Sequence, residues 1–437
     1  MRSERDKLGE IQLEDEKLYG IQTARAVDNF KLDYKKTNLQ LIYAIVTIKK
    51  AAAVTYEKLG IGKDGIYSAV SDVCDMILEG KADDAFVTEA LQGGAGTSTN
   101  MNVNEVIANL TLLKLGFKGG SYDIIHPLDD VNRGQSTNDV YSTALRIAGI
   151  QMLRKLSEAC AKLQQALQIK ENEFDSIMKL GRTELMDAVP ITLGQEFGSY
   201  AQAVARDRWR LYKVEERLRQ VNIGGTAVGI GTNAERKYRF GVIEVLRELT
   251  GIGLATAEYP MDITQNNDVF VEVSGLLKAL AVNLMKISND LRLMNSGPKG
   301  GLAEIILAPM QMGSTIMPGK VNPVIPEMVM QVSMRVMAND LAISNAAAHG
   351  EFELNAFLPL IADSLLESLG LLVNSVELFR TKCIEGIKPN VERCRELLES
   401  SYAFAAAYTP FLGYDKVSEI IEKASDNPQR AKEMLDD

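Results

Sequence analysis

The sequence has few of the residues on which metal centres, disulfide frameworks and nucleic-acid surfaces depend. Its 437 residues include two histidines and four cysteines, and the cysteines show no CxxC spacing. Zinc sites and disulfide frameworks are therefore not expected, and Cys74, Cys160, Cys383 and Cys394 are predicted to be buried thiols. The formal net charge is −10, and no cluster of lysine and arginine stands out. A nucleic-acid partner is not expected, because phosphate binding requires clustered cations.

Targeting signals and membrane spans are also missing from the sequence. The first residues, Met1 to Lys7, are charged and lack the apolar run of a signal peptide. No uninterrupted apolar stretch reaches the length that spans a membrane. These absences predict a cytoplasmic protein without a membrane partner. Hydrophobic residues make up 46% and charged residues 24% of the chain, which are ordinary values for a globular protein, so folding throughout is expected.

Apolar residues at helical spacing are abundant. From Val273 to Met294 they alternate in steps of four and three, which places them on one stripe of a helix that Ser296-Gly297-Pro298 should end. The same spacing runs from Val140 to Ile169, and similar periodicity covers 329–343 and 357–379. Such stripes must pack against other helices, so a helical bundle is predicted. Strand signals are weak and short, which argues against a doubly wound nucleotide-binding fold.

Glycine and small polar residues are concentrated in four segments between these helices. The segments are 93–105, 126–139, 181–190 and 312–323. The hydroxyls and amides of the first segment suit a carboxylate ligand, although helix capping explains them equally well. In the second, Ser136, Thr137 and Asn138 precede a long helix, whose N-terminal dipole favours an anion.

The last two segments and the glycine runs can each be interpreted in structural or in functional terms. Pro190 and the residues up to Glu196 are predicted to begin a helix. Lys320 in the fourth segment supplies a cation for a substrate carboxylate, unless the segment is a solvated loop. Gly93–Gly96 and Gly224–Gly231 lack GxxxxGK[ST] after a convincing strand, so close approach to a substrate or positive φ is favoured over phosphate binding.

Residues 313–322 read Gly-Ser-Thr-Ile-Met-Pro-Gly-Lys-Val-Asn. This run resembles the GSSxMPxKxN signature of the aspartase/fumarase superfamily, with Thr315 in place of the second serine. The other three segments resemble family blocks in the same order, and the likeness extends from about Leu18 to Phe411. The resemblance implies a mostly α-helical, three-domain subunit whose long central helix bundle forms the core of a homotetramer with active sites shared between subunits. The domains expected on this basis are an N-terminal domain (1–135), a central helical-bundle domain (136–385) and a small, shortened C-terminal domain (386–437).

The resemblance also implies a reaction and roles for individual residues. The family reaction is reversible elimination from a succinyl group through an aci-carboxylate dianion, and it requires neither a metal nor an organic cofactor. By this resemblance Ser314 is the base, acting as an alkoxide stabilised by hydrogen-bond donors. The implied substrate-binding residues are Lys320 and Asn322 for the α-carboxylate, Thr97, Ser136 and Thr137 for the β-carboxylate, and Thr183, Asn138 and Glu184 for contacts that include the amino group.

The leaving group distinguishes the branches of the superfamily. The runs Gly93–Ser98 and Gln135–Asp139 resemble the aspartases, whereas Gly224–Gly229 and Gly350–Asn355 resemble the fumarases. The balance favours an ammonia-lyase that converts L-aspartate into fumarate. The alternatives are a fumarate hydratase acting between malate and fumarate, a carbon–nitrogen lyase for a related amino dicarboxylate, and a non-catalytic homologue such as the lens proteins of the superfamily.

Two residues depart from the family pattern. Leu128 occupies the asparagine position of the usual His-Pro-Asn-Asp run, which argues against a second anion site and leaves His126 a structural role. Glu184 stands where relatives commonly have His or Gln in contact with the substrate. Its carboxylate should repel a substrate carboxylate. Glu184 is therefore expected either to face the amino group of the substrate or to pair with a cation such as Arg182.

Overall fold

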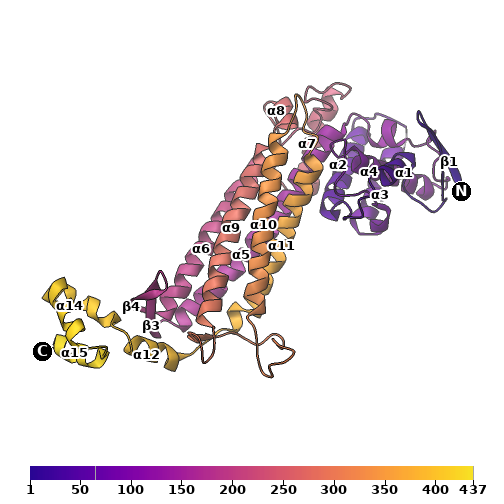
Figure 1. Cartoon of the computed structure of the whole chain (residues 1–437). Helices are drawn as coiled ribbons and strands as arrows, with labels where there is room; N and C mark the ends of the chain where they lie inside the picture. The colour runs from indigo at the N-terminus through magenta and orange to yellow at the C-terminus, as the bar shows by residue number, and fades with distance from the viewer. Residues whose placement is uncertain (64, 437) are drawn as a thin grey trace. The chain divides into compact units, whose positions relative to one another are not determined.

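The computed structural model describes residues 1–63 and 65–436, and most of its regular structure is helical (Figure 1). The helices are α1 (Ile21–Asn29), α2 (Leu39–Lys58), α3 (Ile66–Leu78), α4 (Thr97–Lys114), α5 (Thr137–Glu173), α6 (Leu193–Leu218), α7 (Arg236–Thr250), α8 (Pro260–Gln265), α9 (Asp268–Met294), α10 (Val324–Ala348), α11 (Leu358–Lys382), α12 (Val391–Glu399), α13 (Thr409–Leu412), α14 (Tyr414–Lys423) and α15 (Pro428–Asp436). Short 3₁₀ or π segments are η1 (Asp83–Ala85), η2 (Pro127–Val131), η3 (Ile384–Gly386) and η4 (Ala403–Ala407).

The strands form pairs rather than a larger sheet. They are β1 (Arg2–Asp6), β2 (Gly9–Leu13), β3 (Met178–Thr183), β4 (Met186–Thr192), β5 (Gln220–Val221), β6 (Ala255–Thr256), β7 (Ile305–Ile306) and β8 (Lys388–Pro389). β1–β2, β3–β4 and β7–β8 are antiparallel and β5–β6 is parallel. Across the described ranges no sheet exceeds two strands. The mostly α-helical fold class is thus confirmed.

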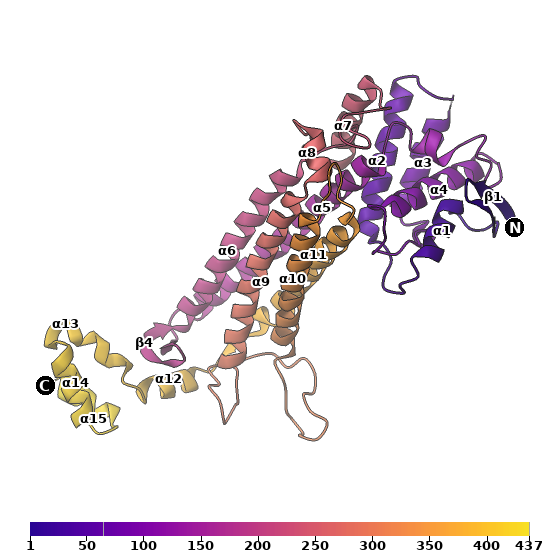
Figure 2. The same ribbon diagram turned by 45° about the horizontal axis from the view of Figure 1, so that its top comes forward.

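The chain divides into two compact units, each built from separate stretches of sequence. Unit 1 comprises Met1–Lys155, Leu211–Leu277 and Val336–Gly370, and unit 2 comprises Leu156–Arg210, Lys278–Arg335 and Leu371–Asp437. Each of the five long helices, α5, α6, α9, α10 and α11, contributes one segment to each unit. Within each unit these segments lie side by side in a bundle (Figures 1 and 2). The division into three domains at residues 135 and 385 stays a prediction.

The apolar stripe read from the sequence forms the buried side of α9. All seven stripe residues, from Val273 to Met294, are at most 4% exposed. α9 ends at Met294, one residue before Ser296-Gly297-Pro298, as predicted. Long helices also cover the other three periodic segments, as α5, α10 and α11. Helical periodicity therefore located the members of the bundle.

α11 is one of the most apolar of the long helices. Its segment from Leu358 to Gly386 is long and apolar enough to cross a membrane by length and composition, but most of it is buried inside the protein. Charged residues such as Asp363 and Glu367 interrupt it. Burial of the apolar positions, including Ile361, Leu365 and Leu369, identifies α11 as a core helix of the bundle.

The core of unit 1 is organised around α2. This helix is buried on nearly every side and packs against α3 and α7. Near its C-terminal end the Tyr56 ring stacks between Tyr67, at 5.5 Å, and Tyr238, at 4.6 Å between centroids. The four cysteines of the chain are buried free thiols, as predicted.

Candidate functional site

Ser314 lies in a loop that closes on itself between β7 and α10. Gly313 N donates a hydrogen bond to Lys320 O at 2.7 Å, and Asn322 Nδ2 donates to Gly313 O at 2.9 Å. A Cβ atom at position 313 would lie 2.8 Å from Lys320 O, so the closure requires glycine there. The structure thus brings Ser314, Lys320 and Asn322 into one compact loop.

The hydroxyl oxygen of Ser314 accepts two backbone hydrogen bonds. Ile316 N donates at 3.2 Å and Met317 N donates at 2.9 Å. Such donors favour the negatively charged form of an oxygen. They are the feature an alkoxide base requires, and no sequence motif could show that they point at Ser314. Lys320 is exposed in the same loop and forms no ion pair with any residue in the described ranges.

Thr183 and Glu184 lie at the tip of the β3–β4 hairpin, which was not predicted. Thr183 pairs with Met186, so Glu184 and Leu185 are the two turn residues. Their φ angles are 55° and 68°, and positive φ at both central residues is the property of a type I′ turn. This turn usually contains Asn-Gly, and its absence here explains why the segment did not read as a hairpin.

A helix does begin within the segment from Pro190 to Glu196, as predicted, but Pro190 itself is not part of it. Pro190 belongs to β4, opposite Leu180, and α6 begins at Leu193. A two-stranded sheet leaves each strand with a free edge, where proline is tolerated. Thr192 and Gln195 then cap α6 reciprocally, with side-chain to backbone hydrogen bonds of 3.0 and 2.9 Å.

Glu184 is exposed and lines a cavity of about 310 Å³ within unit 2. Other charged residues of the lining are Lys179, Arg182, Glu196, Lys286, Asp290 and Glu304. Arg182 pairs with the buried Glu304 at 2.8 Å, so the expected Glu184–Arg182 pair does not form. No ion pair of Glu184 occurs among the residues that the structure describes. Its carboxylate is therefore available to a ligand in this cavity.

In unit 1, Ser136, Thr137 and Asn138 surround the N-terminus of α5. Asn138 N donates to Ser136 Oγ at 3.3 Å, and Asn138 Nδ2 donates to Ala227 O at 2.7 Å. Thr137 Oγ1 accepts from Asn100 Nδ2 at 3.1 Å, which joins the first polar segment to the second. Thr97 is the first residue of α4, and its hydroxyl donates to Gly94 O at 2.8 Å.

Asp139 was not singled out from the sequence, yet it organises this end of α5. It is fully buried and accepts backbone hydrogen bonds from Ser136, Gly224 and Thr226 at 2.9 to 3.0 Å. Burial raises the pKa of the Asp139 carboxyl to about 6, against the lowering effect of those donors. The Gly224–Gly231 loop therefore holds a carboxylate of the protein itself. The Ser136-x-x-Asp139 spacing of a helix cap was the signal that could have revealed it.

Lys49 is a second residue that sequence reasoning missed. It is 1% exposed on α2, and its Nζ donates to Asn132 Oδ1 at 2.8 Å and to Gln135 Oε1 at 2.9 Å. Desolvation lowers the pKa of the Lys49 ammonium to about 7. A lysine in the middle of the mostly apolar run from Leu41 to Val54 was the available signal.

Two other polar residues of these segments have structural partners. Glu105 accepts hydrogen bonds from the backbone N–H groups of Gly20, Gln22 and Thr23 and so caps α1. His126 Nδ1 accepts from the backbone N–H groups of Leu128 and Asp129 at 3.2 Å, which agrees with a structural role for His126.

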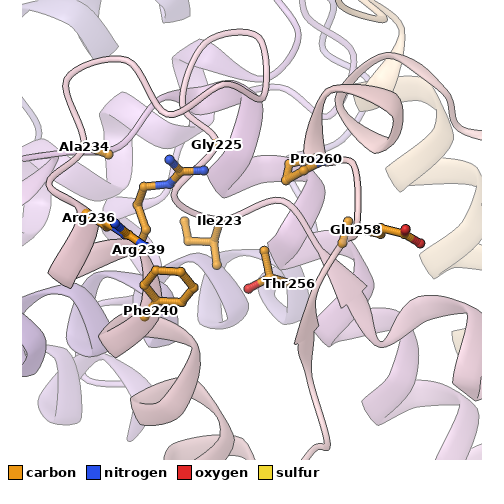
Figure 3. A pocket seen from close by; sticks show the side chains of 10 residues that line it. Ile223, Gly225, Ala234, Arg236, Arg239, Phe240, Thr256, Glu258 and Pro260 are labelled. Carbon is orange, nitrogen blue, oxygen red and sulfur yellow. The ribbon is translucent and has the colours of Figure 1, made fainter.

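A further cavity of about 310 Å³ lies in unit 1 beside the 224–231 loop (Figure 3). Arg236, Arg239 and Phe240 of α7 form one side of it. The Arg239 side chain extends toward Gly225, whereas the Glu258 carboxylate points away from it (Figure 3). None of the site residues expected from the sequence lines this cavity.

The expected site residues fall into two sets. Thr97, Ser136, Thr137 and Asn138 belong to unit 1, whereas Thr183, Glu184, Ser314, Lys320 and Asn322 belong to unit 2. Within each unit the structure provides donors, hydroxyls and charges suited to an anionic substrate. Their roles toward that substrate stay predictions.

Comparison with known proteins agrees with the resemblance read from the motifs. A family model described as lyase matches residues 9–338. The aspartate ammonia-lyases of Helicobacter pylori and Bacillus subtilis are 44% and 42% identical over 97% and 99% of this chain, and the matches cover 91% of each. A native structure titled fumarate lyase:delta crystallin from Brucella melitensis is 44% identical, with a TM-score of 0.93 and 100% coverage of both chains. A class II fumarase from Schistosoma mansoni is 33% identical, with a TM-score of 0.95 and coverage of 99% of this chain and 95% of the fumarase. The chain therefore belongs to the lyase family, as a member of the aspartase/fumarase superfamily.

Proposed function

We propose that this protein is an ammonia-lyase that reversibly eliminates ammonia from L-aspartate to give fumarate. The observation that carries the proposal is the similarity, over nearly the whole chain, to proteins named aspartate ammonia-lyase at 42 to 44% identity. The fumarase comparison has lower identity, so hydration of fumarate is the weaker alternative.

Ser314 is the proposed base. Its oxygen, stabilised as an alkoxide by the N–H groups of Ile316 and Met317, removes the proton from the carbon next to the β-carboxylate. The electron pair moves into that carboxylate, which becomes an aci-carboxylate dianion. Collapse of the dianion forms the double bond and breaks the C–N bond, so that ammonia leaves. These steps require neither a metal nor an organic cofactor.

The developing charge needs donors that are in place before the reaction. Thr97, Ser136 and Thr137 are proposed to hold the β-carboxylate, where the charge grows, and such preorganised donors are usually the largest contribution to catalysis. Lys320 and Asn322 are proposed to hold the α-carboxylate. The exposed Lys320 ammonium supports this role, because it is free for an anionic ligand.

The remaining proposed contacts concern the amino group. Thr183 and Asn138 are expected to touch the substrate there. Glu184 supplies a carboxylate at the tip of the β3–β4 hairpin, and an ammonium group is its natural partner. A substrate with a further cationic group would use the same residue.

The active form is proposed to be a homotetramer whose sites combine segments of neighbouring subunits. Apolar side chains on the long helices support this assembly. Val282 on α9 is 50% exposed, and Met334 and Leu341 on α10 are 54% and 65% exposed. Ile316 in the Ser314 loop is 83% exposed. Burial of these side chains against neighbouring subunits would remove apolar surface from water, which favours association. The buried free thiols support a reducing, cytoplasmic location.

Absorbance of fumarate tests the proposed activity. The purified protein is incubated with L-aspartate, with L-malate and with other amino dicarboxylates, and fumarate formation is followed directly. We expect fumarate and ammonia from L-aspartate, and much slower conversion of malate. Preference for malate would establish the hydratase instead. Absence of conversion of every substrate would leave a non-catalytic homologue.

A further inference from the structure

Lys49 has an environment that core packing alone does not explain. Its side chain is buried within α2 and its ammonium has two amide oxygens as partners, those of Asn132 and Gln135. Burial of an ammonium without a directly paired carboxylate is costly. Two titratable groups on other helices act on it: Asp139 on α5, which favours its charge, and Cys74 on α3, a thiol whose pKa burial raises to about 12. Its neighbour Lys50 instead pairs with Asp75 near the surface.

The charged ammonium fixes the direction of a chain of hydrogen bonds. An ammonium can donate but not accept, so Asn132 must turn its Oδ1 toward Lys49. The same Oδ1 accepts from Asn100 Nδ2 at 3.2 Å, and the second hydrogen of that Nδ2 is donated to Thr137 Oγ1 at 3.1 Å. Asn132 Nδ2 donates to Gln135 O at 3.1 Å, which holds the amide in this orientation.

The last hydrogen bond of this series determines whether the Thr137 hydroxyl donates to a ligand or accepts from it. Because Thr137 Oγ1 already accepts from Asn100, its own proton must point elsewhere, and no acceptor for that proton occurs among the residues described. Thr137 is therefore prepared as a donor. A neutral Lys49 could also accept a hydrogen bond, so only its charged form adds to the constraint that Gln135 O places on the Asn132 amide.

We propose that Lys49 is a positioning residue for dicarboxylate binding: its ammonium, through Asn132 and Asn100, makes Thr137 a hydrogen-bond donor to the substrate carboxylate. This inference rests on the proposed function, in which Thr137 holds that carboxylate. It adds a residue outside the motifs and explains a buried charge that the mechanism does not otherwise use.

The proposal has a thermodynamic consequence that can be measured. The pKa of the Lys49 ammonium is about 7 without a ligand. A dianionic ligand at Thr137 favours the protonated form, so binding raises this pKa. At about pH 8, above this pKa, binding therefore draws protons from solution.

Succinate tests this proton uptake separately from turnover, because it has two carboxylates and no leaving group. Titration calorimetry at about pH 8 in two buffers of different ionisation enthalpy measures the protons taken up per bound succinate. We expect uptake in the wild type and in the matched control Lys50→Met. Lys49→Met should lose the uptake and bind succinate about tenfold or more weakly, the effect of one hydrogen bond to a charged group.

The outcomes separate this inference from the proposed function. If the wild type takes up no protons on binding succinate, the inference about Lys49 is refuted without reference to any variant. It is also refuted if Lys49→Met shows the same proton uptake and the same affinity as Lys50→Met. If either result is found in a protein that converts aspartate normally, only the role of Lys49 is refuted and the proposed function stands. A wild type that neither binds succinate nor forms fumarate refutes the proposed function as well. Circular dichroism of Lys49→Met should match that of Lys50→Met, so that a loss of succinate binding is measured on a folded protein.

Discussion

Glu304 offers a quantitative test of how the β3–β4 hairpin is held. Its carboxylate is fully buried and lies 2.8 Å from Arg182 Nη1 and 3.3 Å from Lys179 Nζ. At an effective dielectric constant of about 20 these two attractions amount to roughly 6 and 5 kcal/mol. Desolvation of the buried ions offsets much of this gain, so removing one partner should cost about 3–5 kcal/mol in the free energy of unfolding.

Glu304→Gln removes the charge with little change in shape, and Glu196→Gln is the matched control. Glu196 also pairs with Lys179, at 2.7 Å, but its side chain is 21% exposed, so its loss should cost about 1 kcal/mol or less. Urea unfolding followed by circular dichroism measures both free energies. Because Arg182 adjoins Thr183, Glu304→Gln should also raise KM for aspartate. Equal urea midpoints for the two variants would refute this account of the cluster.

Three further predictions concern the substrate. Lys320→Ala should raise KM in steady-state assays, because the α-carboxylate is already bound in the ground state, and should lower kcat as far as the contact strengthens in the transition state; an unchanged KM would exclude this contact. Co-refolding Ser314→Ala with Thr137→Ala should restore part of the activity, since mixed tetramers contain sites with neither change; demonstrably mixed but inactive tetramers would count against shared sites. Glu184→Gln should weaken binding of the substrate amine if the carboxylate receives it, and should lower KM for aspartate if the charge repels; constant kinetic parameters would place Glu184 outside the site.

The bundle could be predicted because a helix repeats every 3.6 residues and each long helix buries one continuous stripe. The stripe of α9 is visible in the sequence and is buried in the structure. The hairpin could not be read in this way. Its turn residues, Glu184 and Leu185, have positive φ angles that their residue types do not suggest, and Pro190 in β4 indicated a helix start.

The candidate site likewise contains residues that the sequence identified and residues that it did not. Motifs identified Ser314 and Lys320, because family signatures are local in sequence. The partners of these motifs are not local. Asp139 meets backbone groups 85 and 87 residues away, and Lys49 meets side chains 83 and 86 residues away. Such pairings follow from tertiary packing, which local periodicity does not specify.

The central claim, that Ser314 is the base of an aspartate-eliminating lyase, is tested most directly by fumarate formation in two neighbouring variants. Ser314→Ala removes the proposed base, and Thr315→Ala removes the adjacent exposed hydroxyl in the same loop. With L-aspartate as substrate, Ser314→Ala should be slower than wild type by about 10²- to 10⁴-fold, and Thr315→Ala should stay close to wild type. A folded Ser314→Ala protein that retains activity within about tenfold of wild type would contradict the account, because losing the proton-abstracting group must cost more than that.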